Sequence, residues 1–234
     1  MSPSARAVSS DRARRAATAR RAWLWPALLG MLFPFAWMGV VSFARGSDGS
    51  FARALGAGWT LGHYRDLFAT AAMNRYLLNS VLVASVVVAL NAATAALVGY
   101  VLGRRRVAGE RFWSWAIVAS LMLPKQVLMI PLYLVLARLH LLDTYAALIL
   151  PFAVDAFSIF LVRQYVAGLP IELEEAARVD GASDWLVFRR VVLPLLRPVL
   201  AVVAIQSFLT NWNSFLFPLV FVDSDRLRDR KSVV

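Results

Sequence analysis

The 234-residue sequence contains no cysteine, only two histidines and only two lysines. Without cysteine there are no disulfides, no thiolate nucleophiles and no cysteine-ligated zinc. The histidines, His63 and His140, lie in separate connecting segments, which argues against metal chemistry. Lys125 follows a proline and Lys231 an arginine, so neither completes the Gly-Lys-Ser/Thr of a phosphate-binding loop. We expect no metal site, no cofactor and no ATP hydrolysis in this chain.

Charged residues are also scarce, at 17%, whereas hydrophobic residues make up 60% of the chain. A soluble domain is nearer half apolar and a quarter charged, so this apolar excess predicts a membrane protein. The net charge of +11 would suit nucleic-acid binding, but the cations, nearly all arginine, cluster between long apolar runs. That arrangement is typical of membrane spans, and we expect no nucleic-acid partner.

Five apolar stretches are long enough to cross a bilayer core about 30 Å thick, which takes roughly 20 residues. These stretches are residues 23–43, 77–102, 112–136, 146–166 and 198–222. The first exceeds the usual signal-peptide core of about 7 to 15 residues, which favours a retained anchor over a cleaved signal. We therefore predict an all-α, polytopic membrane helical bundle. Its parts are a basic segment 1–22, a transmembrane domain 23–222 and a basic tail 223–234.

The basic residues predict the orientation of the spans. With the N-terminus in the cytoplasm, the inside segments 1–22, 103–111 and 163–197 hold 15 cations, and the outside segments 44–76 and 137–145 hold 5, as the positive-inside rule requires. Five spans would also place the tail 223–234, with four more cations, outside, and the tail does not fit the rule. The loops 103–111 and 168–190 are then cytoplasmic, and 46–75 is external. The predicted location is a bacterial inner membrane.

The segment 168–194 is too long for a simple connection, since roughly 2 to 8 residues join neighbouring helices. A proline and three acids suit a first helical turn, and a glycine allows a left-handed end. These residues are Pro170, Glu172, Glu174, Glu175 and Gly181. Ser183 or Asp184 is placed to cap a second helix. The pattern predicts a short surface helix in a loop that binds a partner.

Within this loop, Glu175-Ala176-Ala177, three residues, Gly181, nine residues and Val191-x-Leu193-Pro194 resemble a known motif. It is the EAA loop of the permease subunits of ATP-binding-cassette (ABC) importers, with valine in place of the usual isoleucine. The segments 79–84, 129–133, 160–164 and 212–218 look like the carbohydrate-transport, MalG-like branch of that family. The resemblance runs from about residue 23 to residue 222.

The resemblance implies a partner for the loop. In this family the loop helix docks into a groove on a separate cytoplasmic ATPase dimer, which binds Mg-ATP. A second permease subunit and an extracytoplasmic solute-binding protein complete the importer. The implied coupling residues are Glu175, Ala176, Ala177, Asp180, Gly181, Leu193 and Pro194. The alternative is that they only pack the loop against its own membrane domain.

Polar residues in the fifth stretch recur at helical spacing, which predicts a continuous polar stripe on one helix. Such groups are costly in lipid, so the stripe should face protein or a wet pathway. The pathway candidates are Gln206, Thr210, Asn211, Trp212, Asn213 and Ser214, with Ser207 beside them. Trp212 would stack on a sugar ring. Hydrogen bonding between helices is the alternative, and it is our interpretation of Asn79, Ser80 and Asn91 in the second stretch.

Lys125 and Asp155 place a charge in the third and the fourth span. Burying either charge alone costs at least about 2.5 kcal/mol, so we expect an ion pair or contact with a water-filled cavity. Both residues are pathway candidates. Pro124 is expected to interrupt the helix of the third span.

Members of the family have six spans, whereas the segment after residue 222 has no apolar run. This difference favours a truncated chain over a functional five-span variant. We interpret the sequence as a permease subunit for a carbohydrate or polyol. The alternatives are an ABC permease for another polar solute, an inactive truncated permease, and an ion-coupled carrier that uses Lys125 and Asp155.

Overall fold

The computed structural model describes residues 3–45, 51–56, 58–69, 71–105 and 108–224. In these ranges the chain is almost entirely helical, with one isolated β-bridge, between Ala44 and Trp59, and no strand. The predicted all-α class is confirmed. The chain divides into two compact units between Thr70 and Ala71. Beyond Ser224 the predicted basic tail lies outside the described residues.

The first unit contains one long helix and two short ones: α1 (Pro3–Phe43), α2 (Phe51–Gly56) and α3 (Gly62–Ala69). The Trp23–Phe43 part of α1 is long and apolar enough to cross a membrane, and it is not buried within the protein. Tyr64 of α3 donates a hydrogen bond to the Oγ of Ser42 over 2.8 Å, and its ring contacts Phe43. α3 is thereby fixed to the end of α1.

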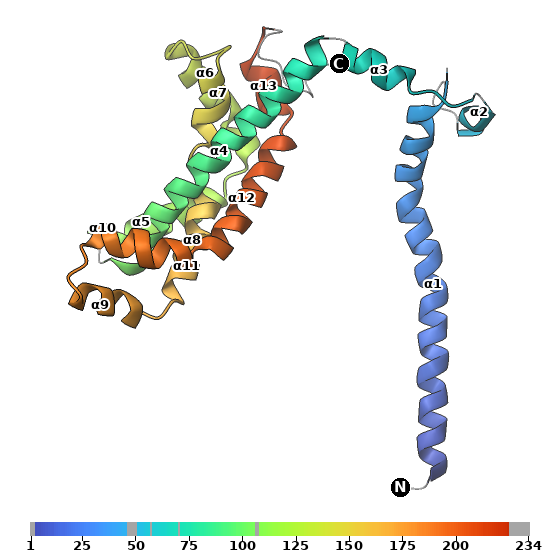
Figure 1. The fold of residues 1–234 in the computed structure, drawn as a ribbon, viewed down its shortest axis with the longest axis horizontal. Helices are drawn as coiled ribbons and strands as arrows, with labels where there is room; N and C mark the ends of the chain where they lie inside the picture. Colours follow the sequence, from blue (N-terminus) through green and yellow to red (C-terminus); the bar gives the residue numbers. More distant parts are fainter. Residues whose placement is uncertain (1–2, 46–50, 57, 70, 106–107, 225–234) are drawn as a thin grey trace. The chain divides into compact units, whose positions relative to one another are not determined.

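The second unit is built around α4 (Ala71–Arg104), which packs along α8 (Ala156–Ala167) and α12 (Arg197–Trp212) (Figure 1). α4 and α8 approach closely because a glycine lies between them. A Cβ atom on Gly99 would lie 2.8 Å from the side chain of Val162, closer than real contacts allow. Small residues serve the same purpose at helix contacts in membranes generally.

The third, fourth and fifth predicted spans are interrupted helices. The third consists of α5 (Glu110–Leu121), η1 (Lys125–Leu128) and α6 (Met129–Arg138), and the bend at the break is 97°. The fourth is α7 (Tyr145–Ile149), η2 (Leu150–Phe152) and α8, and the fifth is α12 and α13 (Leu216–Phe221). The break at Pro124 was predicted. Within the described ranges, three segments are long and apolar enough to span: Trp23–Phe43, Met73–Arg104 and Tyr145–Ala167. The number rises to five if two bent pairs each count as one span, namely Glu110–Leu121 with Lys125–Arg138 and Asp184–Leu195 with Arg197–Trp212.

One sequence-based expectation about the fifth span is wrong. A continuous polar stripe requires a continuous helix, but α12 ends at Trp212 and Asn213 is its C-cap residue. Asn213 and Ser214 therefore lie in a short connection to α13 rather than on the helical face that holds Gln206 and Thr210.

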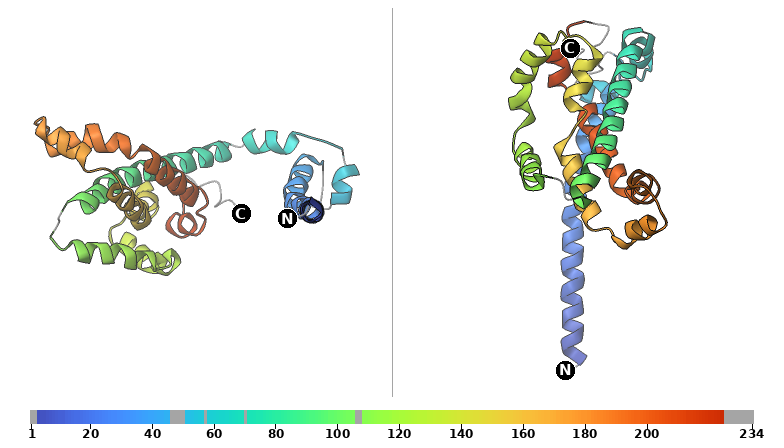
Figure 2. Two further views of the ribbon diagram at one scale, coloured as in Figure 1. Left: turned by 90° about the horizontal axis from the view of Figure 1, so that it is seen from below. Right: turned by 90° about the vertical axis from the view of Figure 1, so that its left-hand side faces the viewer.

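The long loop folds into short helices: α9 (Glu172–Val179), α10 (Asp184–Val187), η3 (Phe188–Val192, a π turn) and α11 (Leu193–Leu195). Gly181 has φ +84°, which confirms the left-handed end of α9. Ser183 caps α10 by accepting a hydrogen bond from the Leu186 N–H over 3.4 Å. Figures 1 and 2 show α9 and α10 at one end of the second unit, and the α6–α7 connection and α13 at the other.

At the end opposite α9, Asp143 ties two segments together. Its Oδ1 accepts hydrogen bonds from the backbone N–H groups of Asp223 (3.1 Å) and Ser224 (2.9 Å). Its own N–H donates to the carbonyl of Phe221 over 2.9 Å. Asp143 has φ +59°, a left-handed conformation that aspartate and asparagine tolerate better than most residues. The connection between α6 and α7 thus holds the end of α13.

Candidate functional site: a cavity at the helix breaks and a loop helix with two faces

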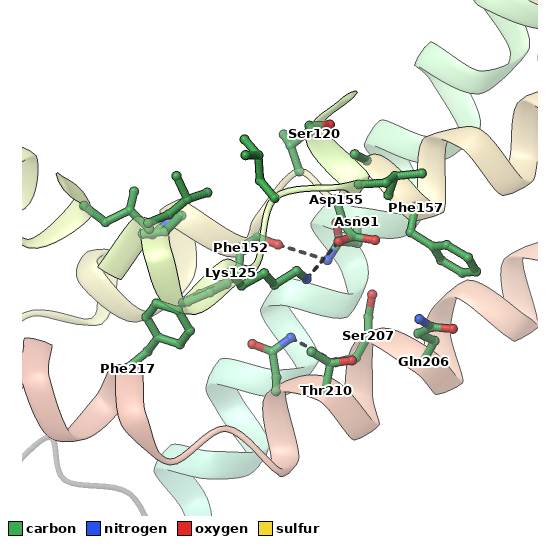
Figure 3. Close-up of a pocket in the computed structure, with 18 residues that line it drawn as sticks. Asn91, Ser120, Lys125, Phe152, Asp155, Phe157, Gln206, Ser207, Thr210 and Phe217 are labelled. Carbon is green, nitrogen blue, oxygen red and sulfur yellow. Dashed lines mark hydrogen bonds and ion pairs between the residues drawn. The ribbon is translucent and has the colours of Figure 1, made fainter. Parts of the chain in front are cut away.

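A cavity of about 390 Å³ lies where the spans are interrupted. It draws polar side chains from α4, from the two breaks and from α12 (Figure 3). These residues are Asn91, Ser120, Lys125, Asp155, Gln206, Ser207, Thr210 and Asn211. Phe152, Phe157 and Phe217 add aromatic surface. Non-helical backbone at membrane depth is tolerated where it lines a wet cavity, so the breaks and the cavity belong to one feature.

Lys125 and Asp155 form the ion pair that the sequence allowed. The Lys125 Nζ donates to the Asp155 Oδ1 over 3.0 Å, and the other carboxylate oxygen caps α8 by accepting from the N–H and the hydroxyl of Ser158. The Lys125 side chain remains 57% exposed and that of Asp155 19%. An ammonium group has three N–H donors, so Lys125 keeps donors that can face the cavity.

Asn91 contributes a buried acceptor to the same cavity. Its Nδ2 donates to the carbonyl of Phe152 over 3.0 Å, which confirms the expected interhelical contact. Its Oδ1 is buried and accepts no hydrogen bond from any described residue. A buried carbonyl oxygen without a donor is unfavourable, so a hydroxyl or a water that reached this atom would stabilise it.

The pathway candidates of the fifth span are divided between two cavities. Gln206, Thr210 and Asn211 line the large one. Asn211, Trp212 and Ser214 line a second cavity of about 30 Å³, together with Asn79 and Ser80. Asn213 lines neither. The ring of Trp212 stacks on Phe208 with 5.3 Å between centroids, so one face of the indole is already covered.

The loop helix α9 has an inner and an outer face. On the inner face, Glu174 is buried and Ala177 packs against the core cluster that α4, α8, α10, η3 and α12 share. The outer face and the turn that follows expose Glu175, Ala176, Asp180 and Gly181. Of the two remaining predicted coupling residues, Leu193 is half-buried and Pro194 is exposed. The inner face therefore packs the loop against its own membrane domain, and the coupling role of the exposed residues stays a prediction.

Glu174 is a residue that the motif did not single out. Its carboxylate accepts hydrogen bonds from the Tyr100 hydroxyl and the Arg104 Nε, both over 2.9 Å, and from Arg178 over 3.2 Å. The only signal in the sequence for the inward position of Glu174 is helical periodicity, because a helix places residues 174, 177 and 178 on one side. The donors on α4 are about 70 residues away in sequence.

A second set of charges fixes the start of α10. The carboxylate of Asp184 pairs with Arg105, at the end of α4, and with the Arg178 Nε at 3.5 Å. The hydrogen bond from Arg105 is the main cause that lowers the pKa of Asp184 below its ordinary range, and Arg178 contributes. In the described part of the chain, no cluster of three or more His, Cys, Asp or Glu residues is arranged to hold a metal ion.

Comparisons with known proteins agree with this architecture. Residues 95–229 match the model of the family described as binding-protein-dependent transport system inner membrane component. The arabinooligosaccharides transport system permease protein AraQ of Halalkalibacterium halodurans is 41% identical over 147 residues, which are 63% of this chain and 53% of AraQ. The chain therefore spans about half the length of that relative.

Two further proteins match nearly the whole chain. The diacetylchitobiose uptake system permease protein NgcG of Streptomyces coelicolor is 34% identical over 224 residues, covering 94% of this chain and 74% of NgcG. A crystal structure of a bacterial ABC transporter involved in the import of the acidic polysaccharide alginate superposes with a TM-score of 0.84 at 23% identity. That match covers 94% of this chain and 78% of the other. These matches show that the chain belongs to the family of binding-protein-dependent transport system inner membrane components.

Proposed function

We propose that this chain is a permease subunit of an ABC importer and forms part of the membrane pathway for a carbohydrate or polyol. A second permease, a cytoplasmic ATPase dimer and an extracytoplasmic solute-binding protein would complete the importer. The ATPase would bind Mg-ATP, and this chain would need no cofactor. Both relatives are named for oligosaccharide uptake, which supports the substrate class.

One observation carries the proposal: α9 is anchored on one face and exposed on the other. The buried Glu174 and the packed Ala177 hold the inner face, while Glu175, Ala176 and Asp180 remain exposed. A helix held in this way can fill a groove on a partner with its outer face and pass a displacement to the membrane domain.

The cavity supports the substrate class. It offers amide, hydroxyl and ammonium groups next to phenyl rings, and a sugar ring presents hydroxyls around apolar C–H faces. A volume of about 390 Å³ lies within the usual range for small-molecule sites, roughly 300 to 1,000 Å³. Lys125, Asp155, Gln206, Thr210 and Asn211 are the proposed pathway residues.

The decisive experiment introduces a bulky cation on the outer face of α9. Ala176→Arg is compared with Ala108→Arg, which places the same charge on an exposed position of the loop between α4 and α5. In the complete importer, Ala176→Arg should abolish co-purification of the ATPase and substrate-stimulated hydrolysis, whereas Ala108→Arg should preserve both. Equal retention in the two variants would show that α9 is not the coupling element. Uptake that follows a proton gradient and ignores ATP would instead favour an ion-coupled carrier.

A further inference from the structure

Glu174 connects the loop helix to a helix that is remote in sequence. The residue is 3% exposed, and its two oxygens accept from Tyr100 and Arg104 of α4 and from Arg178 of α9 itself. Arg104 also donates to the carbonyl of Leu169, at the start of the loop. Two groups on α4 thus hold both the beginning of the loop and the inner face of α9.

The hydrogen bonds of Glu174 lead to a helix that is not a neighbour of α9 in the chain. α9 lies between α8 and α12 in sequence, so a displacement of α9 would be expected to pass into those two helices. The buried carboxylate instead bonds to α4. Separating a buried charge from its donors is strongly unfavourable, so α9 and this end of α4 should move together.

α4 also reaches the cavity without a break. It is helical from Ala71 to Arg104, and Asn91 lies on it nine residues before Tyr100, about 13.5 Å along the axis at 1.5 Å per residue. Asn91 lines the cavity, and its Oδ1 is buried without a hydrogen-bond partner among the described residues. α8 and α12 also reach the cavity, but the chain that joins them to α9 is interrupted. Residues 168–171 are not helical, and a bend of 71° separates Asp184–Leu195 from Arg197–Trp212.

We propose that Glu174 is a positioning residue that clamps α9 to α4, so that α4 carries the displacement of the loop helix to the Asn91 side of the cavity. The inference rests on the proposed function, because the ATPase supplies the displacement. The clamp itself is a property of this chain and can be tested without the ATPase.

The first test measures the distance between α9 and α4 in the purified full-length chain in lipid nanodiscs. Spin labels are attached through Val179→Cys and Val101→Cys, in a chain that has no other cysteine. We expect one narrow distance distribution, unchanged by Glu172→Ala, which removes an exposed carboxylate from the same helical turn. Glu174→Ala should broaden it, and the milder Tyr100→Phe should broaden it less. A distribution that Glu174→Ala leaves narrow would overturn the clamp.

The second test uses the complete importer and measures solute uptake per ATP hydrolysed. Glu174→Ala should lower this ratio about fivefold or more while hydrolysis continues, and Glu172→Ala should leave it unchanged. A merely structural role would lower uptake and hydrolysis together, and an unchanged ratio would likewise contradict the inference. ATPase that still binds to Ala176→Arg would refute the coupling role of α9 in the proposed function, whereas a narrow distance distribution in Glu174→Ala would refute only the clamp.

Discussion

The ammonium nitrogen of Lys125 lies 3.0 Å from the Oδ1 of Asp155, and the pair joins the breaks of two separate membrane spans. The two residues are 30 positions apart in sequence, at the first residue of η1 and the N-cap of α8. The break in the third span is therefore fixed to the break in the fourth by a single ion pair at the cavity wall.

We predict that this pair stabilises the protein modestly. Lys125→Met and Asp155→Asn should each lower the melting temperature of the purified permease, and the double variant should lose less than the sum. The coupling energy should be about 0.5–1 kcal/mol, because Lys125 is more than half exposed and solvent screens the attraction. Asparagine can still cap α8, so Asp155→Asn removes the charge and keeps the cap. Strictly additive losses would mean that the two side chains do not pair in the membrane.

The cavity predicts which polar residues of the fifth span matter for transport. Gln206→Leu and Thr210→Val should each reduce uptake about five- to tenfold in the complete importer, as expected for one lost hydrogen bond of about 1 kcal/mol to a hydroxyl. Asn213→Leu is the matched control, because Asn213 lines neither cavity. Uptake that falls most in Asn213→Leu would place the pathway along the other side of α12.

The orientation of the second unit can be tested with single cysteines. Val179 on α9 is 87% exposed and Leu139 after α6 is 60% exposed, at opposite ends of the unit. If the N-terminus is cytoplasmic, an impermeant maleimide should label Leu139→Cys in intact cells and label Val179→Cys only after lysis. The reverse pattern would invert the topology.

The contact between α4 and α8 should be sensitive to one methyl group. Gly99→Ala places a Cβ 2.8 Å from Val162 and 3.1 Å from the backbone nitrogen of Arg163. The resulting overpacking should cost about 1–3 kcal/mol, partly offset by a helix-propensity gain of about 1 kcal/mol. Gly39→Ala in α1 meets no atom within 4 Å and shows the propensity gain alone. Equal melting temperatures for the two variants would contradict the close packing.

Because of Asp143, the folding stability of the protein should decrease as the pH falls in the acid range. The backbone N–H of Ser224 is the main cause that lowers the pKa of the Asp143 carboxyl below its ordinary value of 3.8. A lowered folded-state pKa stabilises the fold above the unfolded value, and this contribution disappears as pH falls through the lowered pKa. The wild type should therefore lose more stability between about pH 5 and pH 3 than Asp143→Asn, whose side chain suits the same left-handed conformation. A wild-type pH profile for Asp143→Asn would show that the hydrogen bond from Ser224 does not contribute to the pH dependence of stability.

Hydropathy and the positions of prolines were sufficient to predict part of this fold. Apolar runs of about 20 residues predicted membrane spans, and Pro124 predicted the break in the third span, because proline cannot donate the helical hydrogen bond. The end of α12 at Trp212 had no such signal, since neither Asn213 nor Ser214 is a strong helix breaker. The predicted polar stripe was therefore extended one turn too far.

The roles of neighbouring glutamates show what the sequence could not reveal. Glu174 and Glu175 are adjacent and chemically identical, yet one is buried and the other exposed. Their difference depends on Tyr100 and Arg104, which reach α9 only because α4 packs beside α8 at Gly99. Motif spacing locates the loop, whereas the direction of each side chain requires the tertiary arrangement.

The broken third span also has a consequence for how the protein is made. α5 has 12 residues and spans about 18 Å, which is well short of a bilayer core of about 30 Å. Lys125 lies just beyond the break that follows α5, and a lysine near the centre of a span opposes insertion by about 2.5–3.5 kcal/mol. Its partner Asp155 is synthesised 30 residues later, so the third span carries an unpaired lysine until the fourth span is made. We therefore expect the third span to reach its full stability in the membrane only once the fourth has inserted, so that this hairpin, rather than each helix alone, behaves as the unit of biogenesis.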